Sequence, residues 1–379
     1  MVYADTQGNY GYLAAALSPI RKNWDGLLPV PGKDGKYEWE GFLPLEQLPR
    51  ELNGANGYYA SANNDVVPKF FPDYKIPLGF EYSTPYRYER ITEVLEQDKK
   101  FDIADMESLQ GDHLSLPARQ LVPLFKGITS DSPEVQTAID QLLKWDFVLD
   151  RNSVEATIYE YWILKLTPLA YALHLPEKTR GSFHTYDLRR VIGWMKSPDP
   201  DFGPNPVIAR NNMMVAALEQ ALKDLGKKLG DDRSRWKWGS AHKARFEHPL
   251  LTAQTASLLT VSPVSRGGDA YTVQATSSPS EENANEVHGA SAMFVLDTKD
   301  WDHSVGLNAP GNESQAGSPH YSDLATRWGD GRYFPLAFSR AKVEEVAESR
   351  LVLQPAPKPE GQIRGPSDST TPADKSVPR

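Results

Sequence analysis

Residues 3–13 of this chain read YADTQGNYGYL, and this stretch sets the expectation for the fold. The cluster Asp5–Asn9 contains residues that favour tight turns, while the Tyr, Val and Leu residues on both sides favour strands. We therefore predict a β-hairpin over residues 1–16. Residues 17–62 are punctuated by Pro and Gly and lack a helical period, which indicates loops and short strands.

A helical section is predicted to follow the strands. Residues 84–99 open with Thr84-Pro85, a typical pair at the start of a helix, and continue with apolar residues at helical spacing. Residues 154–172 are apolar on most sides, which indicates a buried helix, and Pro168 predicts a kink or an early end there. The same reasoning gives the full set of expected helices as 84–99, 104–125, 133–146, 153–172, 187–196 and 206–228.

Beyond Gly230 the sequence changes to aromatic and β-prone segments. Residues 271–275 and 292–296 are predicted to be strands, with the polar stretch 276–288 as a loop between them. The order of strands, helices and strands predicts an α+β chain. Few large apolar side chains occur in residues 353–379, so this Pro/Ser-rich tail is predicted to be disordered.

Composition narrows the class of protein. The chain has 379 residues, a net charge of −9 and no cysteine, which excludes disulfides, thiolate metal sites and cysteine nucleophiles. The acidic balance, with a pI near 5.5, argues against a nucleic-acid partner. No apolar run approaches the roughly 18 residues that span a bilayer, so no membrane segment is predicted, and no secretory signal is visible.

Common catalytic signatures are missing from the sequence. No nucleophile elbow, Walker A loop or dinucleotide-binding fingerprint occurs. His242, Glu247 and His248 lie close together, but their spacing does not suit a zinc helix. The aromatic stretch WKWGSAH at 236–242 is interpreted as scaffold, with the histidine hydrogen-bonded to hold the rings, or else as the edge of a pocket.

Two features allow a structural and a functional interpretation. Asn63 and Asn64 are adjacent asparagines, which are usually turn formers, although a neutral amide also suits the stabilisation of a developing oxyanion. Arg90 lies early on a predicted amphipathic helix, where an arginine is most often a solvated charge. The residues alone leave both alternatives open.

Several further motifs follow one another along the chain. They are LPVPG (28–32), WEGFLP (39–44), YASANN (59–64), YRYERITE (86–93), LLKWD (142–146), WKWGSAH (236–242), HGASAMFVLD (288–297), and NAPGN with SPHYSD (308–323). Their order resembles the β-chain of the penicillin acylase family, a group of N-terminal-nucleophile (Ntn) amidohydrolases. The resemblance covers about residues 2–345 and implies part of an Ntn-hydrolase αββα fold, with a helical middle section and a C-terminal β-rich region.

The resemblance also assigns roles to individual residues. Asn63 matches the asparagine whose side-chain N–H contributes to the oxyanion hole, although Ala62 replaces the family's aromatic neighbour there. Arg90 matches the arginine that orients the nucleophile, with Arg87 as second choice. A structural calcium ion is implied, with a carbonyl ligand from Gly26, a carboxylate ligand from Glu81 and the other ligands outside this chain.

The nucleophile of the family is the first residue of the β-chain, yet here the chain starts with Met1-Val2, and neither can attack an amide. The expectation is therefore a C-terminal portion of a β-chain, inactive alone, whose partners are the α-chain, the N-terminal part of the β-chain and a small acylated-amine substrate. The family implies a periplasmic or secreted location. The expected domains are 1–352, with parts at 1–83, 84–230 and 231–352, and the tail 353–379.

Three rival interpretations remain from the sequence. The aromatic loops could form a non-catalytic binding module for a carbohydrate or aromatic ligand. The chain could be one half of a split acylase whose partner supplies the nucleophile. It could also be a truncated reading frame with no function of its own.

Overall fold

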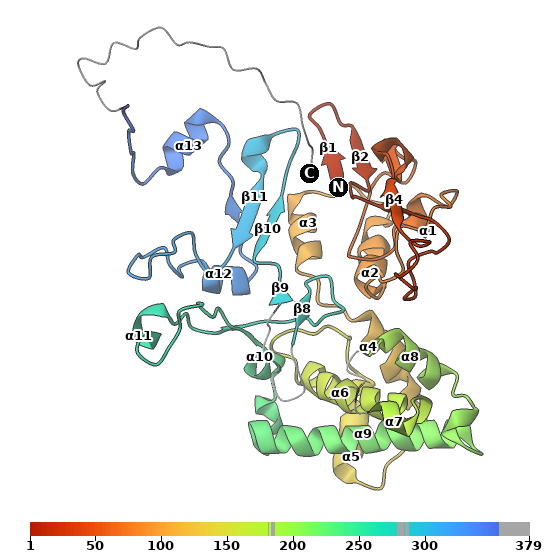
Figure 1. Ribbon diagram of the computed structural model, residues 1–379. Coiled ribbons are helices and arrows are strands. Elements are labelled where there is room, and N and C mark those ends of the chain that lie inside the picture. The colour runs from red at the N-terminus through yellow and green to blue at the C-terminus, as the bar shows by residue number, and fades with distance from the viewer. Residues whose placement is uncertain (181, 183–185, 279–283, 285–287, 356–379) are drawn as a thin grey trace. The chain divides into compact units, whose positions relative to one another are not determined.

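The protein is described from a computed structural model that covers residues 1–180, 182, 186–278, 284 and 288–355 (Figure 1). The chain divides into two compact units, Met1–Phe338 and Ser339–Arg379. The first unit holds the strands and helices discussed below. In the second unit, α13 (Arg340–Val346) starts at Ser339, whose side chain accepts from the Lys342 N–H. The predicted tail lies mostly outside the described residues, and the predicted domain divisions stay predictions.

The N-terminal hairpin forms as the sequence predicts. β1 (Val2–Ala4) and β2 (Tyr10–Leu13) pair antiparallel, with Tyr3 opposite Gly11, and β5 (Arg50–Leu52) adds to the other edge of β2. The turn is closed by Asp5, whose Oδ1 accepts from the Gln7 and Asn9 N–H groups, both at 2.9 Å. A short carboxylate acceptor inside a turn satisfies donors that the strands cannot reach, which explains why this polar cluster reverses the chain.

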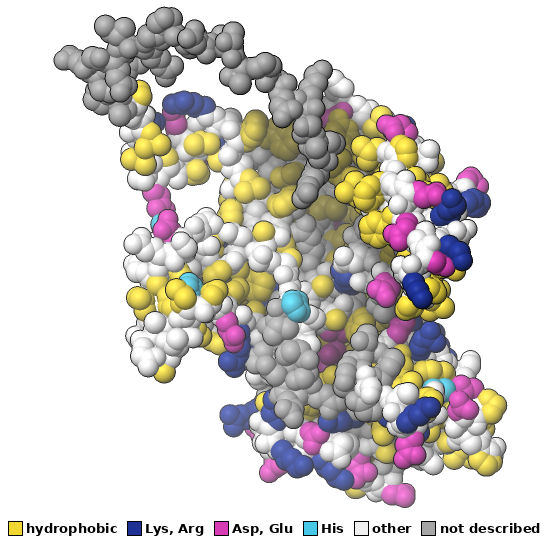
Figure 2. All heavy atoms as spheres, viewed as in Figure 1, with side chains coloured by type: hydrophobic (Ala, Val, Ile, Leu, Met, Phe, Trp, Pro, Cys, Tyr) yellow, Lys and Arg dark blue, Asp and Glu magenta, His cyan; other side chains and the backbone are white. Residues whose placement is uncertain are grey.

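This N-terminal sheet leaves a large apolar surface uncovered. Met1 is 68% exposed, Leu52 is 62% exposed and Trp39 on the neighbouring β4 (Trp39–Phe42) is 57% exposed. Figure 2 shows hydrophobic side chains gathered over these N-terminal strands, whereas charged side chains are frequent on the visible face of the helical section. An apolar face of this kind is typical of a surface that is covered by other protein.

The helical section is built around two long helices. α6 (Val154–His174) packs along α9 (Pro206–Leu229), and the Trp162 indole N–H donates to the Met214 carbonyl at 3.0 Å between them. Trp162 is fully buried and its ring centroid lies 4.8 Å from that of Phe125. Most of the buried apolar side chains belong to one cluster centred on this pair, so this section provides the main core.

Most of the predicted helices are present, with two corrections. The predicted helix 104–125 is broken into α3 (Ile103–Gln110), α4 (Leu116–Leu121) and a 3-10 turn, because residues 113–115 pair with 147–149 instead: the Ser115 N–H donates to the Phe147 carbonyl at 2.9 Å. Of the two alternatives at Pro168, a kink or an early end, the early end is wrong, because α6 continues to His174 and still buries Ala170 and Tyr171. The other helices are α1 (Val67–Phe70), α2 (Tyr86–Leu95), α5 (Pro133–Leu142), α7 (Glu177–Arg180), α8 (Leu188–Lys196), α10 (Trp238–Ala241), α11 (Ala256–Leu259) and α12 (Ala325–Gly329).

The C-terminal part of the first unit returns to strands. The predicted strand 292–296 is present as β10 (Ala292–Val295), which pairs with β11 (Val305–Asn308). The predicted strand 271–275 is wrong: Asp269 Oδ1 accepts from the Tyr271 N–H at 2.7 Å and the Thr272 N–H at 2.8 Å, which bends this segment into turns. The remaining strands are β3 (Pro19–Arg21), β6 (Lys243–Ala244), β7 (Val264–Ser265), β8 (Thr276–Ser277), β9 (His288–Gly289) and β12 (Phe334–Pro335). The α+β prediction is confirmed, with described sheets of two or three strands.

The aromatic stretch 236–242 belongs to the scaffold. Trp236 and Trp238 are buried, and the Trp238 indole stacks on the His242 ring with centroids 4.6 Å apart. His242 is also buried, its Nδ1 contacts the Ala284 carbonyl, and burial lowers its pKa to about 4. These rings therefore fill the core, and no metal-binding group that includes His242 is found among the described residues.

No helix in the described part of the chain combines the length and the apolar character needed to cross a bilayer.

Candidate functional site

The loop that carries Asn63 is held by its neighbours. Asn63 has φ 62°, in the left-handed region that Asn tolerates better than other residues with a side chain. Its carbonyl accepts from the Ser83 N–H at 2.9 Å. The adjacent Asn64 is buried, and its side chain accepts from the Ala62 N–H at 2.9 Å. Asn64 thus performs the turn-forming role, while the Asn63 side chain stays exposed.

Arg87 determines which way the Asn63 amide points. Arg87 lies in the first turn of α2, and its Nη2 donates to Asn63 Oδ1 at 3.0 Å. Because a guanidinium group can only donate, the carbonyl end of the amide must face Arg87. The NH₂ end is then directed elsewhere, and no acceptor for it is found among the described residues. The amide is therefore a fixed hydrogen-bond donor.

The charge of Arg87 is kept at an unfavourable position. A cation in the first turn of a helix opposes the helix dipole, at a cost of a few tenths of a kcal/mol or more. Arg87 is also half-buried, and this burial lowers the pKa of its guanidinium group. Because both effects disfavour a charged arginine at this position, we infer that the positive charge of Arg87 acts on the Asn63 amide that it contacts.

Asn63 and Arg87 line a hollow of about 680 Å³, a volume within the usual range for small-molecule sites. Segment 270–277 and the strands β9 and β10 provide most of the remaining lining. Arg266 also lines the hollow, and its buried guanidinium group lies 3.7 Å from the Trp328 ring centroid. The described lining includes two arginines and no carboxylate, so the site favours a ligand that develops negative charge.

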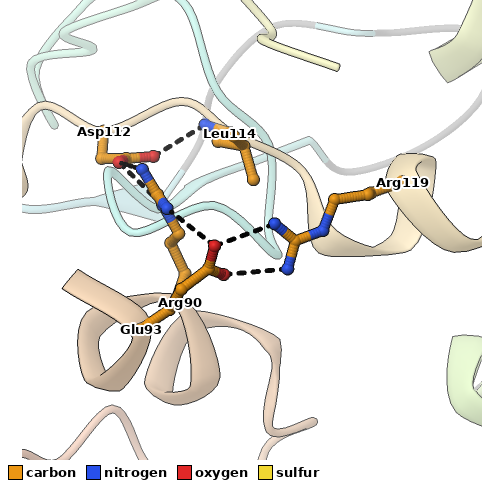
Figure 3. Close-up of polar contacts among 5 residues, drawn as sticks. All are labelled: Arg90, Glu93, Asp112, Leu114 and Arg119. Atoms are coloured by element: carbon orange, nitrogen blue, oxygen red, sulfur yellow. Dashed lines mark hydrogen bonds and ion pairs between the residues drawn. The ribbon is translucent and has the colours of Figure 1, made fainter. Parts of the chain in front are cut away.

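Arg90 is engaged in a different interaction. Its Nε and Nη2 donate to Asp112 Oδ2 at 2.9 and 2.7 Å, and Glu93 lies beside it and pairs with Arg119 (Figure 3). Asp112 also accepts from the Leu114 N–H at 2.8 Å, at the point where the predicted helix 104–125 is interrupted. The structure therefore brings Arg87, rather than Arg90, into contact with Asn63, and the predicted role of Arg90 remains a prediction.

The two predicted calcium ligands provide few of the contacts that calcium needs. Gly26 has φ 95°, and Glu81 is exposed on the loop before α2. Glu81 does not belong to any group of three metal-capable side chains in the described chain. Calcium takes six to eight oxygen ligands, so these residues could supply only a minor share, and the calcium ion remains a prediction.

Comparison with solved structures gives the class of fold. The chain matches a thermostable penicillin G acylase from Alcaligenes faecalis with a TM-score of 0.59 and 19% identity, over 94% of this chain and 68% of that one. This likeness identifies the fold as part of the Ntn-hydrolase fold, as the sequence predicts.

The family is shown by sequence. Residues 1–345 match the sequence model of the penicillin amidase family, and the chain belongs to that family. It is 30% identical to penicillin acylase 2 proenzyme from Pseudomonas sp. (strain SE83) and 25% identical to acyl-homoserine lactone acylase QuiP from Pseudomonas fluorescens (strain Pf0-1). Each of these matches covers 94% of this chain, but only 46% and 45% of the relative, so the chain spans about half the length of these relatives.

Sequence reasoning gave Asn63 first place but ranked Arg87 behind Arg90. One signal in favour of Arg87 was available, because it lies two residues after Pro85, in the first turn of the predicted helix, and its charge opposes the dipole there. Arg266 and Asp112 were missed, since neither residue stands in a pattern that indicates where its side chain is directed.

Proposed function

We propose that this chain supplies the oxyanion-binding half of an amidohydrolase that cleaves linear carboxamides through an acyl-enzyme. The observation that supports the proposal most directly is the Asn63 amide, whose carbonyl end is bound by Arg87 and whose NH₂ end can donate. When a nucleophile attacks an amide, negative charge develops on the carbonyl oxygen, and a preorganised N–H donor stabilises that charge. Arg87 polarises the amide and adds positive potential.

The nucleophile is proposed to come from a preceding segment, as an N-terminal residue whose own α-amine acts as base. The apolar face on the N-terminal strands supports this arrangement, because it offers a surface for the rest of the enzyme to cover. In this proposal the α-chain and the N-terminal part of the β-chain are partners, the location is periplasmic or secreted, and calcium is bound at the junction. The substrate class is an acylated amine, such as the amide of a penicillin or an acyl-homoserine lactone.

The rival interpretation as an aromatic binding module receives less support. Trp236 and Trp238 are 1% and 2% exposed, so their ring faces are not available to stack on a sugar or an aromatic ligand. The hollow beside Asn63, which combines an amide donor and two arginines with an apolar wall, fits an amidase better.

Activity of the assembled enzyme tests the proposal. We expect the purified chain alone to leave a chromogenic phenylacetyl anilide and a fatty-acyl anilide intact, because the proposed nucleophile belongs to the preceding segment. Ser277 and His288 both line the hollow as opposite residues of β8 and β9, but among the described contacts no hydrogen bond joins their side chains. Co-expression with its native upstream coding region should yield a complex that hydrolyses one of them with saturation kinetics. Saturable hydrolysis by the isolated chain would contradict the proposal, as would a stable complex that cleaves no amide.

Replacing Arg87 and Arg90 by methionine, one at a time, should distinguish their roles. In the assembled enzyme, we expect Arg87→Met to lower kcat on the order of 10–100-fold, because the Asn63 amide loses the contact that orients it. Arg90→Met should mainly lower the free energy of unfolding, by about 1–3 kcal/mol, because it leaves the partly buried Asp112 carboxylate without its cation. Steady-state kinetics and urea unfolding of both variants provide the measurement. The reverse pattern would identify Arg90 as the orienting residue.

A further inference from the structure

Within the described residues, one group of three side chains could hold a metal ion: His174, Asp199 and Asp201. One ligand atom from each lies within 4.8 Å of the others. His174 is the last residue of α6, and the two aspartates flank Pro200 on a 3-10 turn (Pro200–Phe202) that packs against α6 and α9. The group belongs to the helical section and includes none of the residues that line the hollow at Asn63.

The His174 ring is fixed in one orientation. Its Nδ1 lies 2.8 Å from the Ala170 carbonyl oxygen, which can only accept, so Nδ1 carries a hydrogen and donates. Its face stacks on Trp194 with centroids 3.7 Å apart and an interplanar angle of 4°, and Phe202 contacts its edge. A histidine that donates one ring N–H to a backbone carbonyl and directs the other nitrogen outward is in the arrangement typical of metal ligands.

The second ring nitrogen faces a carboxylate. His174 Nε2 lies 3.0 Å from Asp199 Oδ2, while Asp199 Oδ1 accepts from the Asp201 N–H at 3.1 Å and is thereby occupied. Because Nδ1 already carries the hydrogen, the Nε2 lone pair and the Asp199 oxygen are two acceptors in contact. A positive species must lie between them, either a proton or a metal ion.

Asp201 adds a third possible metal ligand. A proton on Nε2 would satisfy His174 and Asp199 and would leave the Asp201 carboxylate unused. This carboxylate is exposed, and it has no hydrogen bond or ion pair among the described residues. One imidazole with two carboxylates is a donor set that suits divalent transition metals, and three protein ligands with water in the fourth position is a common zinc arrangement.

We propose that His174, Asp199 and Asp201 form a binding site for a divalent transition metal of the zinc class. Zn–N and Zn–O bonds of about 2.0–2.2 Å require the exposed Asp201 side chain to turn inward while His174 and Asp199 stay in place. The bound metal would join the C-terminal end of α6 to the turn that leads into α9. The site does not depend on the proposed amidase activity.

Titration of untagged, EDTA-treated full-length chain with Zn²⁺ by isothermal calorimetry tests this site. We expect one Zn²⁺ per chain, with His174→Gln abolishing binding. Asp201→Asn should weaken binding at least about tenfold, comparable to the loss of an important metal-site contact, and leave the Tm measured in EDTA unchanged. Because Asp201 is exposed, this variant is expected to fold even if His174→Gln does not.

His320→Gln is the matched control. His320 and Asp323 form a similar pair, with Nδ1 and Oδ2 2.9 Å apart, but they lie outside any group of three metal-capable side chains in the described chain. This variant should bind Zn²⁺ as the wild type does. Absence of saturable Zn²⁺ binding would overturn the proposal, as would wild-type affinity in Asp201→Asn, and either result would make the His174–Asp199 contact an ordinary ion pair.

Discussion

Replacing Asn63 with alanine in the assembled enzyme is expected to lower kcat by about 100–1,000-fold, the usual effect of removing one oxyanion donor. The Asn63 amide is fixed by Arg87 and lies on the wall of a hollow that has no described carboxylate. Gln274 on the same wall also has its Oε1 bound, by His113, but its side chain is buried whereas that of Asn63 is exposed. KM should change much less than kcat, because the donor acts mainly on charge that develops in the transition state.

Asn63→Gly is the control for backbone strain. Asn63 has φ 62°, so an alanine there also carries the cost of a left-handed conformation, whereas glycine does not. If the amide donates to the oxyanion, both variants should lose activity to the same degree. If Asn63→Gly retains near wild-type kcat, Asn63 only shapes the loop and the proposed oxyanion role is wrong.

Glu160→Gln is expected to raise stability at alkaline pH and to flatten its dependence on pH. Glu160 of α6 and Asp269 are both buried, and Glu160 Oε1 and Asp269 Oδ2 have no hydrogen-bond partner. Burial raises the pKa of Glu160 well above its ordinary value, and the charge of Asp269 raises it further. Burial also raises the pKa of Asp269, although two backbone N–H groups oppose the shift.

The direction of this pH effect follows from the number of protons that the folded and the unfolded chain bind. Below about pH 4 both carboxyls are protonated in the folded and the unfolded chain, so their stabilising contribution is fully present. As the pH rises, the unfolded chain ionises freely while the folded chain resists, and this contribution is lost as the pH passes through the raised pKa values. Each unit by which the pKa in the folded chain exceeds that in the unfolded chain amounts to about 1.4 kcal/mol. A glutamine at position 160 cannot ionise, so it does not contribute to this loss.

Urea unfolding at pH 5, 7 and 9 measures this effect. The wild type should lose more stability between pH 5 and 9 than Glu160→Gln does. Glu219→Gln on α9 is the control, because Glu219 is exposed and its pair with Lys223 is of the surface type that contributes little. If the free energy of unfolding changes with pH equally in the wild type and in Glu160→Gln, the buried pair is not protonated in the folded chain.

The sequence was sufficient to predict the secondary structure where neighbouring residues determine it. The Asp5 turn and the amphipathic periods of α2, α5, α8 and α9 depend on residues close to one another in the chain. It was insufficient where distant segments compete with a local preference. The interruption after Gly111 depends on pairing with residues 147–149, and the bend at 271–275 depends on the Asp269 side chain.

The candidate site likewise contains residues that the sequence predicts and contacts that it does not. Asn63 could be chosen from its motif, whereas the contact between Asn63 and Arg87 depends on how α2 packs beside the loop. Arg87 and Arg90 are three residues apart on one helix, so a sequence match could not determine which of them reaches the amide. The Glu160–Asp269 pair joins residues 109 positions apart and has no sequence signal.

The uncovered apolar face of the N-terminal strands has a consequence for the lifetime of the chain in a cell. Chaperones and proteases recognise exposed apolar strands as a sign of an unfolded protein, and Met1, Trp39 and Leu52 present such a surface even when the rest of the chain is folded. Copies that bind a covering partner should therefore persist, while unbound copies should be degraded. In the proposed assembly, the amount of this chain in the cell would then be set by the supply of the chain that covers this face.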